Sequence, residues 1–233
     1  MIYAIIQARM GSKRLPKKVM MNLAGIPVIQ HVVNRTKNSK YIDQVVVATS
    51  EHIENDEFAE YLEKIGVAYY RGSESNVFER YQKGIKKYNL GDNDHIVRIT
   101  ADCPVIDPNI IDRVIELHLK TNSEYTSNTL KRTFPDGLDC EIIKVSAFKR
   151  INDYDLRPDH KEHVTSFITE NRHLFKTMNL ENNQNLGHLR WTLDYLDDFD
   201  YLTHIYDHLY VKNPYFKYEE ILDFVNNSEN KDV

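Results

Sequence analysis

Residues 1–18, MIYAIIQARMGSKRLPKK, decide the fold that we expect for this chain. Residues 2–6 are apolar and partly β-branched, which predicts a strand buried on both faces, as in a parallel sheet. The sequence then becomes basic around Gly11 and Ser12, and Pro16 ends any regular structure. A strand that runs straight into a cationic, glycine-containing loop predicts an anion-binding site at the end of that strand.

The charge of this N-terminal stretch differs from that of the rest of the chain. The 233 residues contain 30 Lys and Arg and 35 Asp and Glu, a formal net charge of −5. Eight of the basic residues, but none of the acids, precede Asp43. A local cationic loop in an acidic protein indicates a ligand with several negative charges. A nucleoside triphosphate fits, because Arg side chains and backbone N–H groups match phosphate oxygens. The alternative is a solvated basic turn.

Composition limits the class of protein. A hydrophobic content of 41% suffices for a core. No apolar run approaches the roughly 18 residues of a membrane span, and the apolar start lacks a signal-peptide cleavage pattern. The two cysteines, Cys103 and Cys140, predict no disulfide framework, which fits a cytoplasmic protein. Mild acidity argues against a general nucleic-acid binder. We therefore expect neither nucleic acid nor membrane as a partner.

The first half of the chain alternates between strand and helix patterns. We expect strands over 2–6, 44–50, 67–70 and 96–100, and helices over 26–37, 53–65, 75–88 and 108–120. Four strand–helix repeats at short spacing predict an α/β fold with a doubly wound, mostly parallel sheet and right-handed crossovers.

The alternation weakens after residue 120. We expect strands over 124–128, 138–144, 175–180 and 189–193, the last of them a late strand of the main sheet, and helices over 146–152, 161–172, 199–209 and 218–226. Residues 227–233 are polar and are expected to be frayed. Without internal repeats or linkers, we expect a single domain over 1–233. Roughly residues 121–188 form an insertion within it, for an acceptor site or a dimer contact.

Two further polar clusters follow predicted strands. Because ligands of doubly wound folds bind at the carboxyl ends of strands, residues 98–104 (RITADCP) and 190–194 (RWTLD) are candidate site segments. Asp102 and Asp194 could hold Mg²⁺ against triphosphate oxygens, since this ion prefers one or two carboxylates plus phosphate oxygens. Asp102 could instead be a turn residue, and Asp194 could be an acid at a helix N-terminus. Glycine motifs of dinucleotide and P-loop sites are absent from the sequence.

Residues 7–18, QARMGSKRLPKK, resemble the nucleotide-binding signature of the sugar-activating cytidylyltransferases. This group includes the acylneuraminate and 3-deoxy-manno-octulosonate cytidylyltransferases and SpsF-type spore coat polysaccharide proteins. Its pattern, A-R-x-x-S-x-R-L-P-x-K, is matched from Ala8 to Lys18, and Gln7 and Gly11 are most similar to the SpsF-type branch. The resemblance implies a Rossmann-like nucleotidyltransferase fold. It also implies nucleotide binding by Gln7, Ala8, Arg9, Gly11, Ser12, Arg14 and Lys18, with Arg9, Lys18 and Asp102 in catalytic roles.

The resemblance extends to the two aspartates and to a helix. Residues 99–106, ITADCPVI, are similar to the family strand whose Asp binds the metal, which implies this role for Asp102. Asp194 resembles the late metal aspartate, but Thr192 stands where acylneuraminate enzymes have another acid, which puts a second fully protein-ligated metal in doubt. Residues 77–81 resemble the segment that encloses the nucleotide. Arg71 and Arg80 are therefore candidate partners for base or phosphates, or else members of salt bridges.

The segments 134–141 (FPDGLDCE) and 161–165 (KEHVT) also resemble SpsF-type sequences. They imply an acceptor site that involves Asp139, Glu141, Glu162 and His163, although each could instead make a hydrogen bond in the core.

The resemblance implies a homodimeric, Mg²⁺-dependent enzyme that transfers CMP from CTP to an acceptor and releases pyrophosphate. The acceptor would be a nonulosonic or ulosonic acid or a phosphorylated small molecule, and the product would serve surface polysaccharide synthesis. Basic loops recognise phosphate rather than base, so UTP or another triphosphate remains an alternative. A further alternative is a nucleotide or sugar binder or a glycosyltransferase. The Asp-x-Asp motif expected of a glycosyltransferase is missing, since Thr100 stands two residues before Asp102, and this argues against that alternative.

Overall fold

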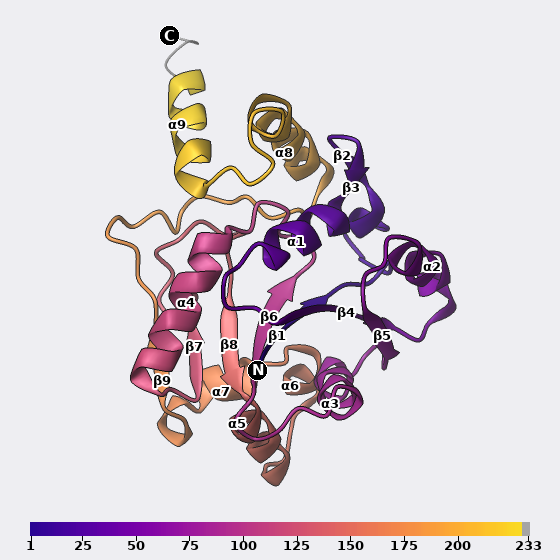
Figure 1. Cartoon of the computed structure of the whole chain (residues 1–233), viewed down its shortest axis with the longest axis vertical. Helices are drawn as coiled ribbons and strands as arrows, with labels where there is room; N and C mark the ends of the chain where they lie inside the picture. The colour runs from indigo at the N-terminus through magenta and orange to yellow at the C-terminus, as the bar shows by residue number, and fades with distance from the viewer. Residues whose placement is uncertain (230–233) are drawn as a thin grey trace.

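A seven-stranded sheet forms the centre of the computed structural model, which describes residues 1–229 (Figure 1). The strand order is β5-β4-β1-β6-β8-β7-β9. β8 pairs antiparallel with β6 and β7, and the other pairs are parallel, so β8 alone runs against the rest. The strands are β1 (Ile2–Gln7), β4 (Gln44–Ser50), β5 (Tyr69–Gly72), β6 (His95–Thr100), β7 (Tyr125–Ser127), β8 (Glu141–Lys144) and β9 (Thr177–Asn179).

Helices cover both faces of this sheet, as predicted for a doubly wound fold (Figure 1). They are α1 (Val28–Lys37), α2 (Asp56–Lys64), α3 (Val77–Lys87), α4 (Pro108–Thr121), α5 (Val145–Arg150), α6 (Pro158–Glu162), α7 (Ser166–Glu170), α8 (Leu196–Leu209) and α9 (Tyr218–Glu229). A short hairpin, β2 (Asn22–Leu23) and β3 (Ile26–Pro27), leads into α1. None of the helices in residues 1–229 is long and apolar enough to cross a bilayer.

Strand β1 lies at the centre of the molecule because it is buried on both faces. Its side chains alternate between two hydrophobic clusters: Ala4 and Ile6 pack in one and Tyr3 and Ile5 in the other. β4 and β6 flank β1 in parallel, so all three strands end at the same edge of the sheet. The loops that follow them are therefore brought together at that edge.

The predicted α/β fold with a mostly parallel sheet is confirmed, and the bounds of strand 44–50 agree with those of β4. The predicted region 121–188 contributes β7, β8 and β9 to one side of the same sheet. Its role in acceptor binding or dimer contact stays a prediction. Of the predicted frayed end, 227–229 belong to α9 and 230–233 lie outside the described residues.

Two predicted elements are wrong. The helix over 161–172 is instead two short helices, α6 and α7, because His163 leaves the helical conformation and the side chain of Ser166 donates to its carbonyl. The strand over 189–193 does not form. Its backbone bonds go to loops, with Trp191 N–H donating to Asp136 O and Leu193 N–H to Asp102 O. This hydrogen bonding places Asp194 beside the end of β6.

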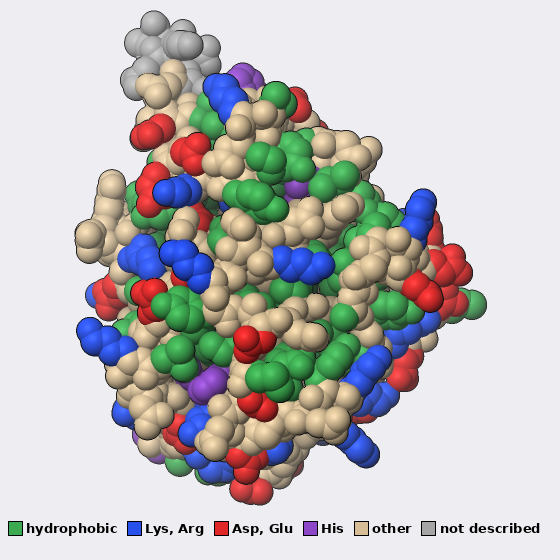
Figure 2. All heavy atoms as spheres, in the orientation of Figure 1, with side chains coloured by type: hydrophobic (Ala, Val, Ile, Leu, Met, Phe, Trp, Pro, Cys, Tyr) green, Lys and Arg blue, Asp and Glu red, His purple; other side chains and the backbone are tan. Residues whose placement is uncertain are grey.

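The surface carries charges of both signs. On the face shown in Figure 2, basic and acidic side chains are interspersed with apolar ones. A continuous basic surface, as expected of a general nucleic-acid binder, does not occupy this face.

Candidate active site

The basic loop after β1 is held in shape by its own backbone and by one buried side chain. Met10 N–H donates to Oδ1 of the buried Asn55 at 2.9 Å, and Lys17 N–H donates to Met10 O at 2.9 Å. Lys17 adopts a left-handed conformation with φ of 60°, which turns the chain into the 3₁₀ turn Lys18–Met20. This turn buries the long side chain of Lys18 and leaves that of Lys17 at the surface.

The ammonium of Lys18 joins the two predicted metal aspartates. Its Nζ lies 2.8 Å from Asp102 Oδ2, 3.0 Å from Asp194 Oδ1 and 2.7 Å from Leu193 O. These contacts use all three donors of the ammonium group. The structure therefore brings together the basic loop, the end of β6 and the segment before α8. The pairing of β1 with β6 accounts for the first two, and the bond from Leu193 N–H to Asp102 O places the third.

Charge and burial shape the protonation of this cluster. Burial alone would lower the pKa of Lys18, but Asp102 and Asp194 outweigh it, and the pKa is raised above its ordinary value. Burial would raise the pKa of Asp194, but the cations around it lower the pKa below its ordinary value. Besides Lys18, these cations are Arg14 at 2.5 Å and Arg190 at 3.0 Å. Lys18 and Asp194 are therefore both charged at neutral pH.

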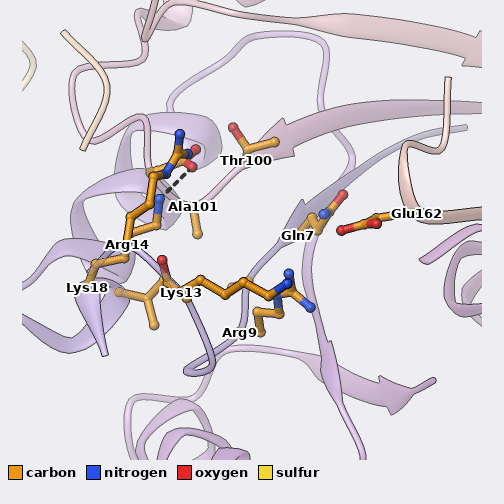
Figure 3. Close-up of a pocket in the computed structure, with 12 residues that line it drawn as sticks. Gln7, Arg9, Lys13, Arg14, Lys18, Thr100, Ala101 and Glu162 are labelled. Carbon is orange, nitrogen blue, oxygen red and sulfur yellow. Dashed lines mark hydrogen bonds and ion pairs between the residues drawn. The ribbon is translucent and has the colours of Figure 1, made fainter. Parts of the chain in front are cut away.

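A cavity of about 290 Å³ opens beside this cluster (Figure 3). One side is formed by the basic loop, another by the end of β6, and Glu162 of α6 points toward Gln7 from across the cavity. The residues that line it are Gln7, Ala8, Arg9, Ser12, Lys13, Arg14, Lys18, Val19, Thr100, Ala101, Asp102 and Glu162. Most of the predicted nucleotide-binding residues thus share one cavity, whereas Gly11 faces a neighbouring hollow beside Glu54.

The predicted arginines of β5 and α3 do not line this cavity. Arg71 donates to Ser50 O and His52 O and pairs with an acid of α2. Arg80 is fully buried and donates to the carbonyls of Ser73 and Glu74. Arg80 thereby holds the loop that carries Glu74, which is the partner of Arg9 at 3.0 Å.

The four predicted acceptor residues lie in three places. Glu162 lines the nucleotide cavity, and Glu141 and His163 line a second cavity of about 410 Å³. Asp139 lines neither cavity and forms a two-pronged ion pair with Arg132 at 2.7 and 2.8 Å. Burial raises the pKa of Asp139, although Arg132 opposes that shift.

Sequence reasoning missed Asn55 and the surroundings of Asp194. Arg190 bridges Asp194 and Asp198, and the ring of Tyr195 lies under the guanidinium of Arg14 at 5.3 Å. The Arg190-x-x-x-Asp194 spacing was visible in the sequence, but its meaning depends on a loop conformation. Asn55 carried no signal, because a lone Asn before a helix ordinarily caps that helix.

Asp102 and Asp194 fit a magnesium site. Each offers one oxygen to the same ammonium group, so their carboxylates converge on a position already occupied by positive charge. Two carboxylates beside a basic cavity of about 290 Å³ match the ligands that Mg²⁺ takes in nucleotide enzymes.

A family model described as Cytidylyltransferase matches residues 3–227. The chain belongs to the cytidylyltransferase family. This membership confirms the resemblance seen in residues 7–18 and makes the protein a CTP-dependent nucleotidyltransferase. The cavity between the basic loop and Asp102 is therefore the candidate site for CTP.

The similarity to known cytidylyltransferases and to an SpsF protein extends over most of the chain. A cytidylyltransferase structure from Leptospira borgpetersenii has a TM-score of 0.91 and 31% identity and covers 98% of this chain and 95% of its own. The spore coat polysaccharide biosynthesis protein SpsF of Bacillus subtilis is 31% identical over 88% of this chain and 86% of its own. The 8-amino-3,8-dideoxy-manno-octulosonate cytidylyltransferase of Shewanella amazonensis is 29% identical over 60% of this chain and 56% of its own.

Proposed function

We propose that this cytidylyltransferase transfers CMP from CTP to an acidic sugar or a phosphorylated small molecule, with release of pyrophosphate, in surface polysaccharide biosynthesis. The observation that carries the proposal is the convergence of Lys18, Asp102 and Asp194 beside the basic cavity. The names of the SpsF relative and of the octulosonate cytidylyltransferase support the acceptor class and the polysaccharide role.

The basic residues of the cavity would bind and neutralise the triphosphate. Arg9 and Arg14 are partly exposed and each pairs with one acid, so both can exchange that acid for a phosphate oxygen. Lys18 is the most buried of the three and alone among them pairs with both aspartates. It would hold the phosphate next to the reacting bond, where a fixed charge in a dry site has the largest effect.

Asp102 and Asp194 would hold Mg²⁺, which supplies charge neutralisation of the phosphates and can lower the pKa of the attacking hydroxyl. The aspartates need no proton transfer of their own for this task. A dedicated protein base is therefore not required by the proposal.

In the proposed reaction, an acceptor oxygen forms a bond to the α-phosphorus of CTP. The bond from that phosphorus to the oxygen bridging to the β-phosphate breaks, pyrophosphate leaves with that electron pair, and the acceptor proton goes to solvent. The protein contributes position and charge, because Lys18 and the arginines stabilise the leaving group. Gln7 and Glu162 lie along the side of the cavity from which an acceptor can enter.

A pyrophosphate-release screen tests this proposal. CTP and UTP are each supplied with Mg²⁺ and with panels of ulosonic acids and of phosphorylated metabolites. We expect release from CTP with at least one acceptor. Release from UTP alone would contradict the cytidylyl assignment, and sugar transfer from a nucleotide sugar without pyrophosphate would favour a glycosyltransferase. We also propose a cytoplasmic homodimer, as the family resemblance implies, which size-exclusion chromatography with light scattering tests for its oligomeric part.

A further inference from the structure

Arg190 holds one oxygen of Asp194, the second of the two carboxylates that the proposed function assigns to Mg²⁺. Nη2 of Arg190 lies 3.0 Å from Asp194 Oδ2. The other oxygen, Oδ1, accepts from Lys18 Nζ at 3.0 Å and from Arg14 Nη2 at 2.5 Å, and both of these cations line the nucleotide cavity. The two oxygens of this carboxylate are therefore held by different sets of cations.

The position of Arg190 is fixed by a closed ring of contacts. Its guanidinium donates to both oxygens of Asp198, at 2.5 and 3.2 Å. Asp198 Oδ2 in turn accepts from the backbone N–H of Asp194 at 2.7 Å and from that of Tyr195 at 2.8 Å. The backbone and the side chain of Asp194 are thus both tied to the start of α8. Capping this helix requires only Asp198, so capping does not explain the bond from Arg190 to Asp194 Oδ2.

Binding of a triphosphate would free only one of the two oxygens of Asp194. Arg14 and Lys18 line the nucleotide cavity, so both can turn from Oδ1 toward a phosphate oxygen. Arg190 is not among the residues that line this cavity, and its ion pair with Asp198 keeps the guanidinium in place. Oδ1 thereby becomes available to a metal ion, while Oδ2 stays with Arg190.

Mg²⁺ and Ca²⁺ differ in what they need from such a carboxylate. Mg²⁺ requires near-ideal octahedral geometry and usually keeps several waters, so a single oxygen from each carboxylate suffices. Ca²⁺ is larger, takes about six to eight oxygen ligands and often binds both oxygens of one carboxylate. A carboxylate with one oxygen withheld therefore disfavours Ca²⁺ more than Mg²⁺.

Asp102, the other proposed ligand, is not restricted in this way. Its Oδ2 accepts from Lys18 Nζ at 2.8 Å, and its Oδ1 lies 3.7 Å from the thiol of Cys103, which is a weak donor. Once Lys18 has turned to a phosphate, both oxygens of Asp102 can approach an ion. The choice between the two ions therefore depends on Asp194 and on the guanidinium that holds its Oδ2.

We propose that Arg190 is a positioning residue that makes the site selective for Mg²⁺ over Ca²⁺, because it limits Asp194 to one metal-binding oxygen. The inference rests on the proposed function and on the metal that this function requires. Without the guanidinium of Arg190, Asp194 could offer both oxygens to an ion. Ca²⁺ would then gain more than Mg²⁺, since it can use the additional ligand.

Thermal stabilisation by the two ions tests the inference. The protein is titrated with MgCl₂ or with CaCl₂ at one fixed concentration of CTP and without acceptor, so that no transfer occurs. For the wild type, we expect the midpoint of stabilisation at a lower concentration of Mg²⁺ than of Ca²⁺. In Arg190→Met, the ratio of the Ca²⁺ midpoint to the Mg²⁺ midpoint should fall by about tenfold, since one more carboxylate oxygen becomes available.

This ratio separates selectivity from a purely structural effect. Disorder of the segment before α8 would weaken the binding of both ions alike and leave the ratio unchanged. The preference of CTP itself for either ion cancels, because wild type and variant are titrated with the same nucleotide. In pyrophosphate-release assays with Mg²⁺, Ca²⁺ should inhibit Arg190→Met at lower concentrations than it inhibits the wild type.

Two further variants complete the experiment. Arg150 of α5 is a matched control, because it also makes a two-pronged ion pair, with Glu124, and packs on an aromatic ring, that of Phe175. Arg150→Met should therefore keep the wild-type ratio. Arg190→Lys retains the charge without the planar fork and should give a ratio between those of the wild type and Arg190→Met. The lysine variant also decides the question if the methionine variant does not fold.

The possible failures of the two proposals can be told apart. A wild-type ratio in the Arg190 variants, or a wild type that is stabilised by Ca²⁺ as readily as by Mg²⁺, would overturn the role of Arg190 and leave the proposed function standing. Absence of pyrophosphate release from CTP with every acceptor, or release that needs no divalent ion, would contradict the proposed magnesium-dependent transfer itself.

Discussion

The ammonium of Lys18 lies 2.8 Å from a carboxylate oxygen of Asp102, although the two residues are 84 positions apart in the sequence. All three donors of Lys18 are engaged, by Asp102, Asp194 and Leu193 O. Lys18 must therefore release at least one acceptor before it can donate to a phosphate. Binding of a divalent cation by the two aspartates would make that exchange favourable.

Asp102→Ala should lose at least about 100-fold of its CTP-dependent pyrophosphate release, because one of the two proposed Mg²⁺ ligands is removed. Circular dichroism should show an intact fold, since Asp102 lies in a loop and 27% of its side chain is exposed. Asp197→Ala, which changes an exposed acid in the first turn of α8, is the matched control. Near-normal turnover in Asp102→Ala would remove this residue from the reaction.

Lys18→Met should destabilise the protein by about 2 kcal/mol, because two partly buried carboxylates lose their shared cation. Urea denaturation measures this loss. Millimolar Mg²⁺ should raise the stability of the variant more than that of the wild type, since a cation can replace the ammonium. Lys17→Met, a change at the exposed neighbour, should show neither effect. Equal Mg²⁺ responses in wild type and Lys18→Met would argue against a metal between the aspartates.

Asn55→Ala should loosen the basic loop, because it removes a buried hydrogen-bond acceptor of that loop. The buried Oδ1 of Asn55 accepts from Met10 N–H at 2.9 Å and from the Thr49 hydroxyl at 3.3 Å. We expect a loss of about 1–3 kcal/mol in unfolding free energy and a raised KM for CTP. Steady-state kinetics with CTP as the varied substrate provide the measurement, with the exposed Asn93→Ala as control. A normal KM for CTP in a destabilised variant would limit Asn55 to a structural role.

The parts of the fold that were predictable are those where burial alone decides the element. The apolar, β-branched runs of β1, β4 and β6 favour strands buried on both faces, and their common edge follows from the parallel order. The convergence of the basic loop with Asp102 depends only on that edge and was therefore accessible from sequence.

Features that depend on loop conformation were not accessible. Residues 189–193 have the pattern of a strand, but their backbone bonds go to Asp136 and Asp102, which no local pattern reveals. Arg80 looks like a surface cation of a helix and is instead buried against two carbonyl groups. For residues 189–193, the deciding hydrogen-bond partners are distant in the sequence. For Arg80, they are carbonyl groups of the preceding turn.

Acid should destabilise the protein through a buried histidine. Burial lowers the pKa of His31 to about 4, and its Nε2 lies 2.6 Å from Leu23 O. The unfolded chain binds a proton near pH 6.5 and the folded chain only near pH 4, so stability falls as pH decreases through this window, by up to about 3 kcal/mol.

Chemical denaturation between pH 7 and pH 4 measures this slope. His31→Gln should flatten it, whatever its effect on stability at pH 7, and His52→Gln at an exposed position should not. An unchanged slope in His31→Gln would contradict the linkage to this group.

A crystal structure with CTP and Mg²⁺ tests the central claim most directly. We predict the triphosphate between Arg9, Arg14 and Lys18, and the metal bound to Asp102 and Asp194, with Lys18 turned from at least one aspartate toward a phosphate oxygen. A nucleotide bound outside the 290 Å³ cavity, or a metal that contacts neither aspartate, would contradict the account.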